Sequence, residues 1–242
     1  ANSNAACSAT GLNLGTPVAA DNCSVASVSN NAPVIFNTGI TTVTWTVTDA
    51  NGNTATATQT VTVIDNTFPT ITAPAAISTT TNTACSATGV VLGTPVTADD
   101  CAVVSVTNNA PATFNLGTTT VTWTVTDASG NATNATQIVT VIDNVNPTIT
   151  APTAVNATTN NGCMALNVAL GTPVTADNCS IASVTHNAPN AFNVGITVVT
   201  WTITDGSGNT ATATQTITVI DNQNPTIIPP SAVTVNSDLN IC

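Results

Sequence analysis

One segment of this chain recurs at a fixed interval, and that interval constrains the fold more than any other feature. Residues 41–66, TTVTWTVTDANGNTATATQTVTVIDN, return nearly unchanged at 119–144 and at 197–222, which is 78 positions further on each time. A period of this length exceeds one coil of a solenoid, so each repeat is expected to be a small domain with its own core. We expect domains at 1–65 (repeat one, without its opening strand), 66–143 (repeat two) and 144–221 (repeat three), and the start of a fourth domain at 222–242.

The recurring segment has the pattern of a β-hairpin. Val43, Trp45 and Val47 alternate with threonines, as in a strand with one buried face. Residues 49–53, Asp-Ala-Asn-Gly-Asn, favour a turn, and a second alternating stretch follows them. In repeat two, turn residues separate further short strands predicted at 69–74, 87–92, 103–106 and 113–114. The sequence therefore predicts an all-β sandwich, with Trp123 as a core residue.

The charge composition excludes several functions. The chain has no Lys or Arg and carries 11 acidic residues, all of them Asp. Nucleic acids and anionic membranes are bound through clustered cations, so neither is an expected partner. No stretch has the length and apolar character of a membrane span, and membrane insertion is not expected. His186, the one imidazole, stands where the other repeats have Asn30 and Asn108, so no catalytic residue is assigned and the chain is predicted not to be an enzyme.

Six of the seven cysteines fall into pairs 16 positions apart, one pair in each repeat. We expect a disulfide within each repeat, which would contribute about 3 kcal/mol by closing a short loop. The alternative, zinc ligation, lacks the CxxC spacing and the histidines of known sites. Disulfides place the protein outside the cytoplasm. The predicted bonds are Cys7–Cys23, Cys85–Cys101 and Cys163–Cys179, with Cys242 bonded to a partner beyond the sequence.

The complete repeat resembles a known extracellular module. The run TPVTADDCAVVSVTNNAP, followed by FNLGTTTVTWTVTDASGNAT and VTVIDNVNPTITAP, is similar to the hyalin repeat (HYR) module. That resemblance implies tandem immunoglobulin-like β-sandwich domains and covers essentially the whole chain. The sequence of these motifs also resembles that of long repetitive cell-surface adhesins of Bacteroidetes, including gliding-motility adhesins. This resemblance implies a bacterial cell-surface location.

Nine of the 11 aspartates occupy three aligned columns: before the second cysteine, at the hairpin turn and at the domain exit. In an immunoglobulin-like sandwich the first two lie at the end that receives the incoming chain, so all three are expected to meet where two domains join. Clustered carboxylates without a basic residue suit Ca²⁺, which binds hard oxygen ligands; the alternative is that each Asp only closes its own turn. Repeat two, which carries the additional Asp100, is expected to bind calcium most tightly. The predicted ligands are Asp65, Asn66, Asp99, Asp100, Asp127 and Asn131 at the first joint, Asp143, Asn144, Asp177, Asn178, Asp205 and Asn209 at the second, and Asp21, Asp49 and Asp221 in the equivalent outer positions.

Together these observations predict an extracellular stalk or fibre segment, stapled by disulfides and stiffened by calcium at its joints. Its partners would be further copies of the same repeat, with a surface or glycan target at a distant tip. One alternative is a module that binds a surface, a glycan or ice through threonine-rich strand faces such as 54–62. Another is a subunit of a head-to-tail filament, in which the opening strand at 224–235 is donated to the unpaired sheet edge of repeat one.

Overall fold

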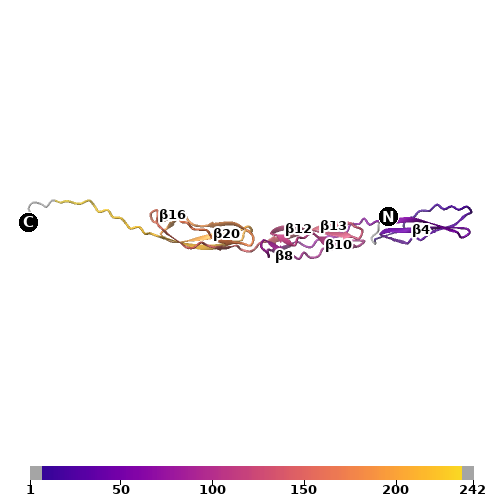
Figure 1. The fold of residues 1–242 in the computed structure, drawn as a ribbon, viewed down its shortest axis with the longest axis horizontal. Coiled ribbons are helices and arrows are strands. Elements are labelled where there is room, and N and C mark those ends of the chain that lie inside the picture. The colour runs from indigo at the N-terminus through magenta and orange to yellow at the C-terminus, as the bar shows by residue number, and fades with distance from the viewer. Residues whose placement is uncertain (1–6, 236–242) are drawn as a thin grey trace, which may run out of the picture. The chain divides into compact units, whose positions relative to one another are not determined.

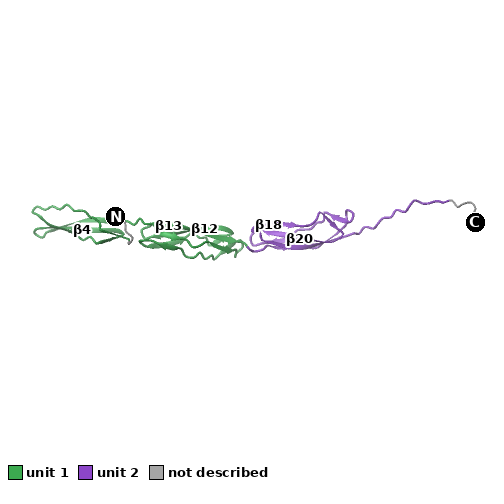
Figure 2. Ribbon diagram, turned by 180° about the vertical axis from the view of Figure 1, so that it is seen from behind, with its two compact units in different colours: residues 1–143 green, residues 144–242 purple. Residues whose placement is uncertain are grey.

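The computed structural model describes residues 7–235 and divides the chain into two compact units, 1–143 and 144–242. The first unit contains repeats one and two and the second contains repeat three (Figure 2). The described residues form strands and no helix, which confirms the predicted all-β class. Because the relative placement of the two units is not determined, we describe each unit separately.

Repeat two is a complete sandwich of eight strands (Figure 1). One layer is a four-stranded sheet in the order β10-β12-β13-β7, with β7 parallel to β13 and the other pairs antiparallel. The pairs β6-β9 and β8-β11 form the remaining two-stranded sheets. The strands are β6 (Thr70–Thr72), β7 (Ile77–Thr80), β8 (Ser86–Thr88), β9 (Val96–Ala98), β10 (Val103–Asn108), β11 (Thr113–Asn115), β12 (Gly117–Asp127) and β13 (Ala132–Ile142).

The hairpin β12-β13 follows the sequence prediction, but three shorter elements differ from it. The predicted strand at 87–92 ends at Thr88, because Gly89 adopts a left-handed backbone with φ of 69°. Strands β7 and β9 lie between the predicted strands, in stretches for which the sequence analysis predicts no strand. Both extra strands are short, and each owes its conformation to a partner distant in sequence.

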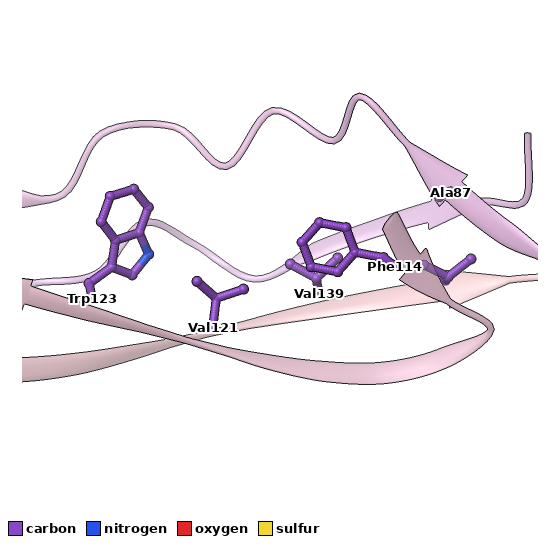
Figure 3. Close-up of a cluster of buried hydrophobic side chains, with 6 residues drawn as sticks. Ala87, Phe114, Val121, Trp123 and Val139 are labelled. Atoms are coloured by element: carbon purple, nitrogen blue, oxygen red, sulfur yellow. The ribbon is translucent and has the colours of Figure 1, made fainter. Parts of the chain in front are cut away.

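The core of repeat two lies on the inner face of the hairpin. Figure 3 shows Trp123 and Val121 projecting from the same side of β12, toward the interior that also receives Phe114 and Val139. Trp123 is 6% exposed, as a core residue should be. Its indole Nε1 donates to Oε1 of the buried Gln137 at 3.1 Å, and Gln137 Nε2 donates to the carbonyls of Ala75 and Leu92 at 2.8 and 2.9 Å. The one polar side chain in this part of the core is thus fully bonded.

Repeat three has the same topology, with the sheet order β15-β21-β20-β18 and the pairs β14-β17 and β16-β19. Trp201, Val199 and Phe192 occupy the equivalent core positions. Its strands are β14 (Thr148–Thr150), β15 (Val155–Thr158), β16 (Met164–Leu166), β17 (Val174–Ala176), β18 (Ile181–His186), β19 (Ala191–Asn193), β20 (Gly195–Asp205) and β21 (Thr210–Ile220).

Repeat one is a partial sandwich within the described residues. Its main sheet has three strands, β2-β4-β5, plus the pair β1-β3, and no described strand lies beyond β5. Consequently Trp45 and Val47 remain half-buried, whereas their equivalents Trp123 and Val125 are buried. Its strands are β1 (Ser8–Thr10), β2 (Val25–Asn30), β3 (Ile35–Asn37), β4 (Gly39–Asp49) and β5 (Thr54–Val63).

Beyond β21 the chain continues as an extended segment without strand pairing, drawn in yellow in Figure 1. Residues 221–235 of this segment are exposed throughout. The predicted start of a fourth domain therefore contains no paired strand in its described part, and Cys242 lies outside the described residues.

Candidate metal centre

The loop between β9 and β10 brings two carboxylates to the end of repeat two that receives the chain from repeat one (the entry end). Asp99 shapes this loop, because its Oδ2 accepts the backbone N–H groups of Cys101 at 2.9 Å and Ala102 at 3.0 Å. Asp100 follows directly and is partly buried. The remaining oxygens, Asp99 Oδ1 and Asp100 Oδ1, are buried and accept no hydrogen bond from the protein.

Asp65, the last residue of repeat one, arrives beside this loop. It is 3% exposed, and its Oδ1 accepts the backbone N–H of Thr67 at 2.9 Å. Carboxylate oxygens of Asp65, Asp99 and Asp100 lie within 4.8 Å of one another. The predicted meeting of the exit and loop columns thus occurs at this joint. Thr67, which the sequence analysis did not single out, adds a contact by donating from Oγ1 to Asp100 Oδ2 at 3.3 Å.

Asn131 fixes the incoming chain against the hairpin turn of repeat two. Its Nδ2 lies 3.2 Å from the carbonyl oxygen of Asp65, 3.0 Å from that of Thr67 and 2.8 Å from Asp127 Oδ2. The contacts with Asp65 and Thr67 link residues more than 60 positions apart. Asn131 therefore holds the incoming chain against the hairpin turn through hydrogen bonds donated by its side-chain amide nitrogen.

Asp127 stands outside the carboxylate cluster and closes the hairpin turn. Its Oδ1 accepts the backbone N–H groups of Ser129 at 2.9 Å and Asn131 at 2.8 Å. Burial raises the pKa of the Asp127 carboxyl, but the hydrogen bonds from Asn131 and the turn outweigh it and hold the pKa below its ordinary value. Asp127 thus closes the hairpin turn of repeat two, and ligation by the hairpin column stays a prediction.

The cluster of Asp65, Asp99 and Asp100 fits a hard divalent cation. Each close pair of carboxylates at this spacing repels by roughly 1–4 kcal/mol, depending on the local dielectric. The 242-residue sequence holds no Lys or Arg to neutralise them. Two buried carboxylate oxygens are available as ligands, and oxygen donors are those that Ca²⁺ prefers. The donor set is too hard for a preference toward zinc or copper.

The cysteines are paired differently from the sequence prediction. Cys7 of repeat one is bonded to Cys101 of repeat two, with their Cα atoms 4.7 Å apart and 94 positions between them in sequence. Cys23 and Cys163 are free and exposed, while Cys85 and Cys179 are each disulfide-bonded. The predicted pairs Cys7–Cys23, Cys85–Cys101 and Cys163–Cys179 are therefore wrong.

The physical reason is that the two cysteines of one repeat lie at opposite ends of the sandwich. The Cys85 carbonyl accepts the N–H of Leu116, beside the start of β12, whereas Cys101 precedes Val103, which pairs with Asp127 at the end of β12. The 11 residues of β12 span about 33 Å, and a disulfide needs Cα atoms about 4–7 Å apart. A bond can form only where the exit end of one repeat meets the entry end of the next.

The disulfide also borders the carboxylate cluster, since Asp65 lies within 4.8 Å of both sulfur atoms. Because Cys101 directly follows Asp100, the bond ties the acidic loop to repeat one. The signal in the sequence was the separation of 94 positions, which recurs between Cys85 and Cys179. The two cysteines of one repeat are only 16 positions apart, but no disulfide joins them.

The other predicted ligands occupy equivalent local positions. Asp21 and Asp177 accept the backbone N–H of the following cysteine, each at 2.8 Å. Asp49 and Asp205 close their hairpin turns with Asn53 and Asn209, and in both the pKa lies below its ordinary value. Hydrogen bonds from Asn53 are the main cause at Asp49. At Asp205 those from Asn209 and the turn outweigh burial, which raises the pKa. Asp221 is exposed and accepts from Gln223 N–H at 3.0 Å.

The meeting of Asp143 and Asn144 with the loops of repeat three stays a prediction, because Asp143 and Asp177 belong to different units.

These observations define a tandem array of immunoglobulin-like β-sandwich domains, in which a disulfide and a cluster of aspartates lie at the joint between repeats one and two. The HYR domain model matches residues 8–63, 64–141 and 142–219. The chain belongs to the HYR domain family.

Two curated relatives are hyalins of sea urchins. The chain is 36% identical over 129 residues to "Hyalin" of Lytechinus variegatus and 34% identical over 135 residues to "Hyalin" of Strongylocentrotus purpuratus. The matches cover 51% and 53% of this chain but 24% and 11% of the relatives. The chain thus corresponds to a small part of either relative.

Solved cadherin structures give a weak likeness. Drosophila N-cadherin EC1-4 matches with 12% identity and a TM-score of 0.37, covering 78% of this chain and 60% of that one. Human CDH23 EC21-23 matches with 12% identity and a TM-score of 0.35, covering 76% and 74%. These scores are too low to carry an argument about ligands or partners. Among the described residues, no helix has the length and apolar character needed to cross a membrane.

Proposed function

We propose that this chain is a segment of an extracellular adhesion-type array, a spacer whose joints are held by a disulfide and by Ca²⁺. The observation that carries the proposal is the joint between repeats one and two, where Asp65, Asp99 and Asp100 converge beside the Cys7–Cys101 bond. A site assembled from two successive domains restricts the joint when it is filled. Its role is therefore mechanical.

The repetition of the chain supports a spacer. The three hairpins are nearly identical in sequence and have the same register, including the pairing of Trp45, Trp123 and Trp201 with alanines of the next strand. Each sandwich would add on the order of 40 Å to an array, given strands of 11 residues and their loops. Disulfides and relatedness to hyalins support an extracellular location, and the resemblance to Bacteroidetes adhesins supports a bacterial cell surface.

Calcium would have a specific effect at such a joint. When bound, a divalent cation offsets two of the three negative charges and is ligated by the two buried carboxylate oxygens that accept no hydrogen bond from the protein. Asp99 is held in position by its own loop and Asp65 by Thr67. Because these residues come from both repeats, a bound cation stabilises the state in which both repeats are folded and in contact at the joint.

The experiment is a thermal melt of the full chain in Ca²⁺ and in excess chelator, with a matched pair of variants. Asp99→Ala removes a carboxylate from the cluster and also the two loop hydrogen bonds. Asp21→Ala removes the same loop bonds in repeat one, through Cys23 and Ser24, but no carboxylate of this joint. We expect Ca²⁺ to raise the Tm of the wild type and of Asp21→Ala, and to raise that of Asp99→Ala less. Equal shifts in all three proteins would contradict the proposal.

A second candidate function is direct binding through the threonine face of repeat one. There the cross-strand pairs Thr42–Thr60, Thr44–Thr58, Thr46–Thr56 and Thr48–Thr54 form an uninterrupted ladder. In repeat two the ladder is broken by Ile138 and Asn134, so the face is not a constant feature of the array. Replacing Thr56 and Thr58 with Lys should abolish binding to an immobilised glycan or ice if this face is the binding surface, and should leave the calcium response unchanged.

A further inference from the structure

Repeat three contains an open pocket, lined by the segment that follows β16 and by the connection between β18 and β19 (the repeat-three pocket). Its volume is about 510 Å³, within the roughly 300–1,000 Å³ that is typical of small-molecule sites. Its lining residues all belong to the second compact unit, so the pocket lies within one sandwich. Buried or half-buried apolar side chains form its base: Val168, Leu170, Phe192 and Trp201.

Three exposed side chains with hydrogen-bonding groups also line this pocket: Asn167, His186 and Asn190. Among the described residues, neither Asn167 nor Asn190 uses its side-chain amide in a hydrogen bond. Each amide offers two N–H donors and a carbonyl acceptor. The lining residues include no Asp, Glu, Lys or Arg. The pocket therefore combines an apolar base with neutral groups that can both donate and accept.

The three polar residues are particular to repeat three. In the order of repeats one, two and three, the aligned residues are Gly11, Gly89 and Asn167, then Asn30, Asn108 and His186, then Val34, Ala112 and Asn190. The other seven of the ten lining residues are the same in repeat two. Repeat three thus keeps the apolar base of repeat two and adds a different set of hydrogen-bonding groups above it.

Asn167 occupies a position where the backbone favours glycine. Its φ is 56°, in the left-handed region, and the aligned Gly11 and Gly89 have φ of 65° and 69°. Asn adopts this conformation more readily than most residues, but at a cost relative to Gly. Repeats one and two make the same turn without a side chain. Folding of the turn therefore does not account for the Asn167 amide, whereas a ligand in the pocket does.

His186 is positioned by two contacts. Its Nδ1 accepts the backbone N–H of Ala188 at 3.3 Å, as Asn108 Oδ1 accepts that of Ala110 at 3.0 Å in repeat two. The ring also lies edge to face with Trp201, with their centroids 4.8 Å apart. Because Nδ1 is an acceptor, the neutral ring carries its proton on Nε2. His186 thus keeps the turn contact of Asn108 and presents an N–H donor from an aromatic ring.

We propose that the repeat-three pocket binds a neutral hexose or N-acetylhexosamine unit of a glycan. The sugar hydroxyl groups donate to and accept from the amides of Asn167 and Asn190, and Nε2–H of His186 donates to a further sugar oxygen. The C–H face of the sugar ring packs on the apolar base. An acidic sugar is disfavoured, because the pocket offers no cation and the chain has a formal net charge of −11.

This site goes beyond the spacer role and lies apart from the threonine face of repeat one. It gives one repeat of the array a binding function that its neighbours lack. An open pocket with few neutral hydrogen bonds binds a single sugar weakly, with a Kd on the order of 1 mM. Many copies of the array on one surface would turn such weak contacts into firm attachment to a glycan-coated partner.

The first test titrates the full, isotope-labelled chain with glucose, galactose, mannose and N-acetylglucosamine, in excess chelator, and follows its NMR signals. We expect saturable shifts of the side-chain N–H signals of Asn167, Asn190 and Trp201 with at least one of these sugars. Glucuronic acid, which has the ring of glucose and a carboxylate, is the charged control and should bind more weakly than glucose. The proposal is overturned if none of the neutral sugars gives saturable shifts, or if the shifts centre outside this pocket.

The second test gives the pocket the residues of repeat two, which the same fold accepts at the aligned positions. Each single change should weaken sugar binding roughly three- to tenfold, and the triple variant should show no saturation. Asn156→Ser is the matched control, because Asn156 is an exposed residue of repeat three outside the pocket and repeat two has Ser78 there. A triple variant that binds as tightly as the wild type would overturn the proposal. The three changes are Asn167→Gly, His186→Asn and Asn190→Ala.

The reverse exchange tests whether these residues suffice. Placing Asn, His and Asn at positions 89, 108 and 112 of repeat two should create a second saturable site, reported by the indole N–H of Trp123. Sugar binding that stays at a single site in this variant would contradict the assignment of specificity to the three residues. All titrations run in chelator, so their failure leaves the calcium proposal intact, and the absence of a calcium response leaves this one intact.

Discussion

Cys7 and Cys101 are bonded across the joint between two successive repeats, although each repeat contains a closer cysteine in sequence. The bond places the covalent restraint between domains, where the chain otherwise continues through a single linker. It also ties the acidic loop of repeat two to the exit of repeat one. The residues that connect the two repeats at this joint lie outside both hydrophobic cores.

The first prediction concerns the stability that this disulfide provides. Cys101→Ser should lower the free energy of unfolding by up to about 4–5 kcal/mol, because the bond closes a loop of 94 residues and restricts the unfolded chain. Denaturant unfolding of the oxidised protein measures the effect. Cys23→Ser and Cys163→Ser, which remove free thiols, are the controls and should leave the midpoint unchanged. Disulfide mapping should recover Cys7–Cys101 and, at the same spacing, Cys85–Cys179; a Cys7–Cys23 peptide would contradict the account.

The second prediction concerns the buried glutamine of repeat two. Gln137→Leu should destabilise this sandwich by about 2–4 kcal/mol, because Trp123 Nε1 and the carbonyls of Ala75 and Leu92 lose their buried partner. Gln59→Leu in repeat one should cost less, since Gln59 is half-buried and, among the described residues, its side chain bonds Trp45 and Leu14 alone. Calorimetric unfolding of both variants at low protein concentration provides the comparison. A larger loss for Gln59→Leu would show that the network is not the source of stability.

The third prediction concerns pH. The folded pKa values of Asp49, Asp127 and Asp205 lie below the ordinary 3.8. The stabilisation from these hairpin turns is therefore fully present above about pH 3.8 and is lost as the pH falls through the lower folded values. Replacing all three with Asn should lower stability at pH 7 and flatten the dependence below pH 3.8. Denaturant titrations at several pH values in chelator measure this slope, and an unchanged slope would assign the acid sensitivity to other groups.

Much of the fold is encoded in local patterns, which is why it could be read from the sequence. The alternation around Trp123 predicts the hairpin and its buried face, and both are present. Strands β7 and β9 were missed because Ile77–Thr80 and Val96–Ala98 are too short for a periodic signal and depend on partners elsewhere in the chain.

The arrangement of residues at the joint was predicted only in part from the sequence. The convergence of Asp65 with Asp99 and Asp100 followed from the sandwich topology, because loops at one end of a sheet lie together. The same argument applied to cysteines would have placed Cys85 and Cys101 at opposite ends of β12. The short sequence separation favoured a disulfide between the two cysteines of one repeat, 16 positions apart, but the length of β12 excludes that bond. The role of Asp127 as a turn residue depends on hydrogen bonds with Asn131 that only the structure shows.

The most direct test of the proposal that calcium holds the joint is a calcium-binding isotherm of the full oxidised chain, compared with that of Asp100→Asn. Asn stands at the equivalent positions 22 and 178, so this substitution keeps a side chain that the fold accepts and removes one negative charge. The account predicts saturable binding by the wild type and an affinity for the first joint that falls severalfold or more in the variant, while the unfolding midpoint in chelator stays the same or rises as repulsion is relieved. Binding that is absent in the wild type, or unchanged in Asp100→Asn, would contradict it.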